Sequence, residues 1–256
     1  MTTLRLTDVS VLRGQRRVID RVTASAGAAE TVALIGPNGA GKSTLLQVLA
    51  GVIRPASGRV ELDGRPPAAM TGPERRKKLS LLSQEGGAEP TLTVEELVGL
   101  TADLPGIEGG TDRVTEALQA VGLEALRSRR LHTLSGGELQ RARLARVWAQ
   151  NAAVVLLDEP TAAQDIEGAA RWAAAVSRLR SRQRLVVVAM HDLSLAARVC
   201  DRWWLLSGGS LVAEGRPDDL LGSGAVERVF CDAVEVSRVG TQWWVRPRLP
   251  PAGGAE

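Results

Sequence analysis

Residues 36–44 read Gly36-Pro37-Asn38-Gly39-Ala40-Gly41-Lys42-Ser43-Thr44. The apolar run 31–35, typical of a buried strand, precedes them, and apolar residues at helical spacing follow over 42–50. Glycines in such a turn let backbone N–H groups surround phosphate oxygens, and the helix N-terminus adds partial positive charge. The flanking strand and helix argue against an incidental glycine-rich turn. The sequence therefore predicts a phosphate-binding loop in which Lys42 reaches the β- and γ-phosphates and Ser43 binds Mg²⁺.

A second apolar run ends in two acids, because residues 154–159 read Val-Val-Leu-Leu-Asp-Glu. The apolar part must be buried, so Asp158 and Glu159 are expected at the carboxyl edge of a parallel sheet, where α/β proteins place their ligands. Asp158 suits a Mg²⁺ site, and Glu159 suits polarising an attacking water. Alone, the run could equally be a strand followed by a capping acid and Pro160. The phosphate-binding loop makes the functional interpretation the better one.

Residues 134–138, Leu-Ser-Gly-Gly-Glu, precede a further helical segment. Two glycines at a helix N-terminus form an anion site, and Ser135 can serve as the N-cap. One nucleotide seldom needs two phosphate cradles. We therefore expect Ser135, Gly136 and Gly137 to serve a nucleotide bound to another subunit.

Hydrophobic periodicity predicts alternating strands and helices along most of the chain. The expected strands are 4–26 with a turn at 13–15, 30–35, 57–63, 79–83, 153–157, 185–189 and a hairpin of 203–206 with 210–213. The expected helices are 42–50 ending before Gly51, 94–100, 113–125, 138–150, 166–179 and 193–200. The pattern is mostly helical between about 85 and 150, which suggests a helical insertion in a main domain of residues 1–222. Residues 223–256 form a short C-terminal extension.

Composition limits the function classes. The chain has 256 residues, of which 44% are hydrophobic and 24% charged, so it can form a full core and is not a disordered chain or a disulfide scaffold. Its formal net charge is +3, and the basic runs 75–78 and 127–130 are expected to be solvated faces. No stretch approaches the ~20 apolar residues that span a bilayer. Lysine occurs only at 42, 77 and 78 among 32 basic residues, which singles out Lys42.

The motifs, taken in order over about residues 4–215, resemble those of the ATP-binding cassette (ABC) family. They are the phosphate-binding loop 36–44, a glutamine after a strand at Gln84, the Leu-Ser-Gly-Gly-Glu signature 134–138, the acidic strand 154–159 and a histidine after a strand at His191. The resemblance implies an α/β fold: a P-loop NTPase core with an N-terminal antiparallel β subdomain and an inserted helical signature subdomain. It also implies binding and hydrolysis of ATP with Mg²⁺.

The resemblance implies roles for individual residues as well. Gln84 would sense Mg²⁺ and water and link to a membrane partner. Ser135 and Gly137 would contact the γ-phosphate of the opposite subunit's nucleotide. His191 would contact the γ-phosphate and hold Glu159 and the water in place, although alone a histidine at a strand end is more often structural.

Two positions depart from the family pattern. Arg13 occupies the place of an aromatic residue that stacks on adenine in the family. A guanidinium plane can also stack on a purine. The alternative interpretation of Arg13 is a solvated arginine in a loop. In the loop after Glu159 only Asp165 is retained of the usual residues, and it could bridge to the partner's phosphate-binding loop. The expected catalytic residues are Glu159, His191 and Gln84; the nucleotide contacts are Arg13, Gly36, Asn38, Gly39, Gly41, Lys42, Ser43, Thr44, Ser135, Gly136, Gly137 and Asp165; and the Mg²⁺ site is Ser43, Gln84 and Asp158.

The C-terminal extension indicates which group of the ABC family the chain resembles. Residues 225–230, 234–236 and 242–245 are similar to the extension of importers for iron–siderophore, haem and cobalamin, whereas residues 99–103 depart from that group. The resemblance implies a homodimer or paired cassette, transmembrane permease subunits, an indirect role for a substrate-binding protein, and no nucleic acid. The permease would hold the chain at the cytoplasmic face of the cell membrane.

Three functions are therefore weighed. The favoured one is an importer ATPase in which ATP binding closes a dimer and hydrolysis resets it. An exporter ATPase for a drug or lipid is the first alternative. A soluble cassette protein acting on ribosomes or DNA is less favoured, because such proteins usually carry two cassettes or a long coiled coil.

Overall fold

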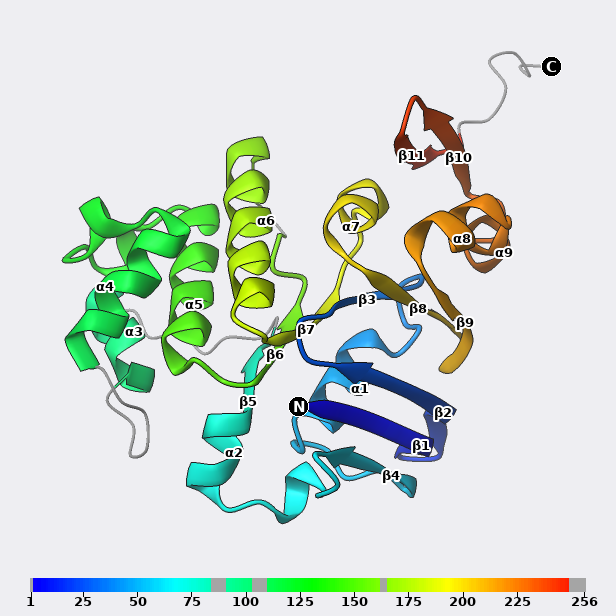
Figure 1. Cartoon of the computed structure of the whole chain (residues 1–256), viewed down its shortest axis with the longest axis horizontal. Coiled ribbons are helices and arrows are strands. Elements are labelled where there is room, and N and C mark those ends of the chain that lie inside the picture. The colour runs from blue at the N-terminus through cyan, green and yellow to red at the C-terminus, as the bar shows by residue number, and fades with distance from the viewer. Residues whose placement is uncertain (1, 84–90, 103–109, 162–164, 249–256) are drawn as a thin grey trace.

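The computed structural model describes residues 2–83, 91–102, 110–161 and 165–248 (Figure 1). Its strands form three sheets with the orders β2-β1-β4, β5-β6-β7-β3-β8-β9 and β10-β11. The six-stranded sheet is the centre of the molecule, and both of its faces are covered. The expected mixed α/β architecture is therefore confirmed.

The central sheet is parallel except at one edge. Its strands are β5 (Leu79–Leu82), β6 (Val154–Asp158), β7 (Leu185–Ala189), β3 (Thr31–Ile35), β8 (Arg202–Ser207) and β9 (Ser210–Gly215), with β9 antiparallel to β8. All five residues are buried in each of β3, β6 and β7, as expected for strands covered on both faces. The carboxyl ends of β3, β6 and β7 therefore meet at one edge, where α/β sheets bind ligands.

The N-terminal sheet is antiparallel and covers one face of the central sheet. It contains β1 (Thr3–Arg13), β2 (Arg16–Gly27) and β4 (Ser57–Leu62). The β1–β2 turn falls at Gly14, with φ +61°, as expected from the sequence. Helix α1 (Lys42–Leu49) lies between the two sheets and ends in a Schellman motif, because Gly51 N–H bonds to Val48 O and Val52 N–H bonds to Gln47 O.

Helices cover the other face of the central sheet (Figure 1). Three of them, α3 (Val94–Ala102), α4 (Gly110–Val121) and α5 (Gly136–Gln150), lie in sequence between β5 and β6 and pack on one another. The helices that alternate with the later strands are α6 (Ile166–Ser181) and α7 (Leu193–Val199). Short 3₁₀ turns occur at Pro67–Ala69, Glu124–Leu126 and Leu131–Thr133.

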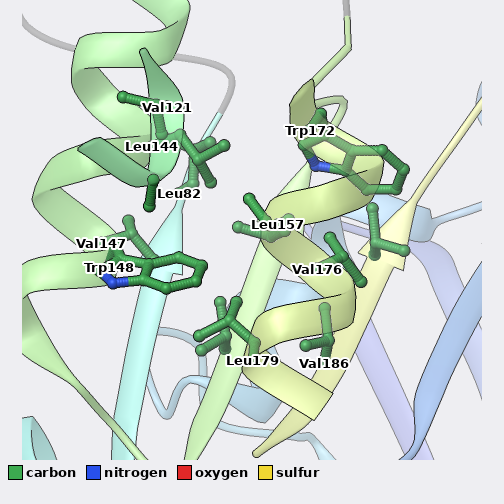
Figure 2. Packing of buried hydrophobic residues seen from close by; sticks show 14 of the residues in the cluster. Leu82, Val121, Leu144, Val147, Trp148, Leu157, Trp172, Val176, Leu179 and Val186 are labelled. Atoms are coloured by element: carbon green, nitrogen blue, oxygen red, sulfur yellow. The ribbon is translucent and has the colours of Figure 1, made fainter. Parts of the chain in front are cut away.

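Strand alternation divides the core into two clusters. Leu157 and Val186 face the helices, whereas their neighbours Leu156 and Val187 face α1 and the antiparallel sheet. Figure 2 shows Trp148 of α5 and Trp172 of α6 on opposite sides of Leu157 and Leu179 in the helical cluster. Each strand of the central sheet thus contributes to both clusters.

After β9 the chain forms two short helices, the second of them in the C-terminal extension, and a two-stranded sheet. Helices α8 (Pro217–Gly222) and α9 (Ala225–Val229) lead to β10 (Val234–Val239) and β11 (Gln242–Pro247). We call β10 and β11 the C-terminal hairpin. Its partly buried residues Val234, Val236, Trp243 and Val245 pack against the helical cluster, so it is attached to the rest of the chain by an apolar face.

One expected helix end was wrong, and one helix was not predicted. The helix expected over 113–125 ends at Val121, because Gly122 takes φ +66° and its neighbour Leu123 donates to Leu118 O in a Schellman motif. The basic run 75–78 is the last part of a helix that was not expected, α2 (Gly72–Lys78), which begins at a Thr71–Glu74 capping box. No residue of this helix is buried, so the run is a solvated face as expected, and its Lys78 pairs with Asp63.

Candidate functional site

A cavity of about 500 Å³ lies at the carboxyl edge of the central sheet. We call it the loop cavity. It is lined by Arg13, Arg16, Val18, Asn38, Gly39, Ala40, Gly41, Lys42, Ser43, Thr44, Glu159 and His191. The structure thus brings together the phosphate-binding loop, Glu159, His191 and the expected base-binding position Arg13, although they lie far apart in the sequence.

Two glycines of the loop occupy places where a side chain would collide. A Cβ on Gly41, which has φ +98°, would lie 2.6 Å from Ile19 Cδ1 and 2.8 Å from Val18 O. A Cβ on Gly36 would lie 2.2 Å from the backbone oxygen of Leu206. The glycines therefore let the loop pack directly on β2 and β8 while its N–H groups line the start of α1.

Lys42 is buried at the first position of α1. Its ammonium donates to the carbonyl oxygens of Gly36, at 2.7 Å, and Pro37, at 3.2 Å, so the side chain folds back over the loop. Burial lowers the pKa of Lys42, and the nearby carboxylates of Glu159 and Asp158 oppose that effect. This places a compact positive charge inside a cradle of backbone donors, as triphosphate binding requires.

Ser43 and Asp158 form the candidate Mg²⁺ site. The Ser43 hydroxyl donates to Asp158 Oδ1 at 3.1 Å, across the interface between α1 and β6. Burial raises the pKa of the Asp158 carboxyl; the hydrogen bond from Ser43 opposes this, and the charge of Glu159 adds to it. A divalent cation would favour the ionised carboxylate, and two hard oxygen donors fit Mg²⁺. Gln84, the third expected ligand, lies outside the described residues.

Among the described residues, no three His, Cys, Asp or Glu side chains gather into a group that could hold a metal. Mg²⁺ typically binds through one or two protein ligands together with substrate phosphates and water, so the Ser43–Asp158 pair suits an ion that arrives with a nucleotide.

Glu159 and His191 are in direct contact. His191 Nε2 lies 2.5 Å from Glu159 Oε1, and the Glu159 side chain is 19% exposed. Glu159 takes the left-handed φ of +50°, and its N–H donates to Ala189 O at 3.1 Å. This turn at the end of β6 brings the carboxylate to His191, two residues beyond the end of β7. A carboxylate oriented by an imidazole beside a phosphate cradle can orient and polarise a water molecule.

The signature residues do not line the loop cavity. Ser135 caps α5 by a capping box in which its Oγ accepts from Glu138 N–H, at 3.3 Å, and its own N–H donates to Glu138 Oε2, at 2.7 Å. Gly136 and Gly137 form the first turn of α5, and a Cβ on Gly136 would meet nothing within 4 Å. The open start of α5 is thus available to a ligand that this chain's own phosphate-binding loop does not hold.

Arg13 lies at the end of β1, where it lines the loop cavity. Its Nη2 donates to Gln47 Oε1 of α1 at 3.0 Å, which fixes the guanidinium at the cavity wall. Arg16 and Val18 of β2 line the same wall, and neither is among the residues predicted from the sequence. Because β1 and β2 pair with Arg13 opposite Arg16, the predicted turn at residues 13–15 could have indicated Arg16.

Asp165 caps the N-terminus of α6, since its Oδ1 accepts from Gly168 N–H at 2.7 Å. It is not among the residues that line the loop cavity. Residues 162–164, the departure from the family loop, lie outside the described part of the chain. The structure thus gives Asp165 a local role beside the predicted contact with a partner.

Comparisons with known proteins agree with this geometry. The ABC transporter family matches residues 19–162. The hemin import ATP-binding protein HmuV of Rhodopseudomonas palustris (strain ATCC BAA-98 / CGA009) is 39% identical over 246 residues, covering 91% of this chain and 90% of the relative. HmuV of Nocardia farcinica is 41% identical over 228 residues, covering 86% of this chain and 78% of the relative.

Among solved structures, the dimeric structure of MJ0796, a bacterial ABC transporter cassette, has 28% identity and a TM-score of 0.76, covering 84% of this chain and 98% of that one. No helix in the described part of the chain has both the length and the apolar character needed to cross a membrane. The fold, the phosphate cradle and the sequence matches agree, and the chain belongs to the ABC transporter family, as one of its ATP-binding and ATP-hydrolysing subunits.

Proposed function

We propose that this chain is the ATPase subunit of an ABC importer for haem. The observation that carries the proposal is the joint presence of an intact loop cavity and 36–41% identity, over more than four fifths of the chain, to proteins named as hemin import ATP-binding proteins. The cargo would pass through other subunits, so the chain's own chemistry is the hydrolysis of ATP.

In this proposal the loop cavity holds the triphosphate. Backbone N–H groups of the loop bind its oxygens, and Lys42 turns from the Gly36 and Pro37 carbonyls toward the β- and γ-phosphates. Ser43 and Asp158 hold Mg²⁺, with Gln84 as a further ligand. The metal, when bound, neutralises charge on the phosphate oxygens. Glu159 orients and polarises the attacking water, and His191 holds the Glu159 carboxylate in place.

Arg13 is the proposed contact to the base. Its guanidinium is fixed by Gln47, and no described acidic side chain forms an ion pair with it. A planar cation held in this way can stack on the face of a purine.

The signature at the start of α5 is proposed to act on a second subunit. Ser135, Gly136 and Gly137 would contact the γ-phosphate in the partner's loop cavity, and Asp165 would approach the partner's phosphate-binding loop. ATP would then bind between two copies, or two paired cassettes, and favour their closed state. Closure and reopening would drive permease subunits at the cytoplasmic face of the membrane, with a substrate-binding protein taking part indirectly and no nucleic acid involved.

Uptake of labelled cargo tests the haem assignment. Cells that lack the protein should lose uptake of labelled haem and keep uptake of labelled siderophore and cobalamin, and the wild-type protein should restore it. A Lys42→Ala variant should not restore uptake, because it lacks the charge that holds the triphosphate. Unchanged haem uptake with loss of another cargo would overturn the assignment to haem while leaving the ATPase function intact.

The fold itself does not favour import over export. A bacterial Atm1-family exporter has a TM-score of 0.80 at 24% identity, covering 90% of this chain and 41% of that one. The sequence relatives favour import. Co-purification with a permease that requires an external binding protein would support import, and ATP-dependent extrusion of cargo would support the exporter alternative.

A further inference from the structure

The C-terminal hairpin is hydrogen-bonded to α7, the helix that follows His191. Val245 N–H donates to Ser194 Oγ at 3.1 Å, and the Ser194 hydroxyl lies 3.5 Å from Val245 O. Ser194 is the second residue of α7, so the contact is at the end of the helix nearest the site. The hairpin therefore holds the first turn of α7 through a backbone group of β11.

The hairpin is itself fixed at a second place. The indole Nε1 of Trp243 donates to Asp218 Oδ1 of α8 at 2.6 Å, and the Arg238 guanidinium lies 5.4 Å from the Trp243 ring centre. Trp243 and Val245 also pack against the helical cluster. The apolar packing and the second hydrogen bond fix the position of the hairpin independently of its contact with α7.

Helix α7 is short, and one of its sides faces a cavity. It has seven residues, of which Leu193 and Ala196 are buried, and it packs on β3, α6 and α8 as well as on β11. The cavity, of about 710 Å³, is lined by α6, by β11 and by Ser194, Leu195, Arg198 and Val199 of α7. On this side α7 lacks close packing, so the hydrogen bond between Ser194 and β11 adds a contact that packing does not supply there.

The start of α7 is directly connected to the proposed catalytic contact. Asp192 caps the helix by accepting from Leu195 N–H at 2.9 Å, and His191 is the residue before this cap. The chain between Ser194 and His191 is thus one capped turn with little freedom. A small displacement of that turn would lengthen the 2.5 Å contact between His191 Nε2 and Glu159 Oε1, and misplacement on the scale of 1 Å can cost large factors in rate.

We propose that Ser194 is a positioning residue, which anchors α7 to the C-terminal hairpin and so keeps His191 against Glu159 during ATP hydrolysis. The inference rests on the proposed roles of His191 and Glu159. It gives the C-terminal extension a function in this chain, namely to set the rate of hydrolysis from outside the loop cavity. Ser194 is not among the residues that line the loop cavity.

The test is steady-state ATP hydrolysis by the full chain with Mg²⁺. Ser194→Ala should lower kcat about three- to ten-fold, the size expected when one positioning hydrogen bond is lost, and leave KM for ATP within about two-fold. Ser194→Thr retains the hydroxyl and should keep most of kcat. Ser177→Ala removes a hydroxyl from the α6 wall of the same cavity and should leave kcat unchanged.

A double-mutant cycle separates positioning from general stability. If Ser194 acts through His191, then Ser194→Ala should cause no further loss of kcat in a His191→Ala background. An equal loss in both backgrounds, or a loss matched by Ser177→Ala, would overturn the proposal. If His191→Ala alone leaves kcat unchanged, the assigned role of His191 fails, and that outcome is distinguishable from failure of the anchor.

Discussion

Arg13 stands at the wall of the loop cavity with its guanidinium bonded to Gln47. A stacking role makes a specific prediction for binding. Arg13→Ala should weaken ATP binding by a factor between about 5 and 150, since stacking on a base contributes roughly 1–3 kcal/mol, whereas Arg13→Tyr should bind nearly as well as wild type. Isothermal titration calorimetry measures both affinities.

Inorganic tripolyphosphate is the control ligand for Arg13, because it has no base. Its affinity should be the same in wild type and in Arg13→Ala. If tripolyphosphate loses as much affinity as ATP does, Arg13 acts on the phosphates and the stacking role is wrong.

Glu159 carries its carboxylate on a left-handed backbone, with φ +50°. A residue with a Cβ pays about 1–2 kcal/mol for this conformation, whereas glycine adopts it freely. Glu159→Gly should therefore unfold with a free energy about 1 kcal/mol higher than that of Glu159→Ala, as measured by urea denaturation. Both variants lose the contact to His191 equally, so the comparison isolates the backbone; equal stability of the two would contradict it.

Part of the site could be predicted residue by residue. The spacing of glycines with Lys42 and the acids after an apolar run predicted which residues meet, because strand ends of a parallel sheet share one edge. The conformation of Glu159 could not be predicted, because it depends on the N–H bond to Ala189 on a strand distant in the sequence. Arg16 was missed although the predicted turn at residues 13–15 pairs it with Arg13, because no motif marks it as a site residue.

At the scale of elements, the cap of α6 allows two roles of Asp165 to be separated. Asn caps helices about as well as Asp, so Asp165→Asn should unfold with the same free energy and melting temperature as wild type. Asp165→Ala should have a free energy of unfolding about 1 kcal/mol lower. If the Asp165 charge also contacts the partner subunit, Asp165→Asn should lower ATP turnover without lowering the melting temperature. Turnover equal to wild type in Asp165→Asn would leave Asp165 as a helix cap alone.

The elements show why some helices were predicted better than others. The stop at Gly51 was expected and is confirmed, whereas the stop at Gly122 was overlooked within a run of apolar residues, although glycine adopts the required positive φ without strain. Helix α2 was missed despite its capping-box pattern at Thr71 and Glu74, since its seven residues include none that is buried. Hydrophobic periodicity cannot reveal a helix that has no apolar face.

For the whole molecule, the signature and the loop cavity lie on separate parts of the chain, which predicts an ATP-dependent dimer. Glu159→Gln should bind ATP normally, lose nearly all turnover and accumulate as a dimer, because the closed state is not reset by hydrolysis. Size-exclusion chromatography with light scattering, with and without ATP, measures this state. Ser135→Arg in the same background should keep ATP binding and remain monomeric, and turnover unchanged in Glu159→Gln would refute the role of Glu159.

The alternation of side chains in the central sheet has a consequence for how the molecule melts. Each of its buried strands belongs to both hydrophobic clusters. If either the helical side or the α1 side unfolded alone, apolar side chains of the same strands would become exposed to water. The two sides should therefore behave as one cooperative unit. Amides of β3, β6 and β7 should be the slowest in the protein to exchange with deuterium, and they should exchange together, only on global unfolding.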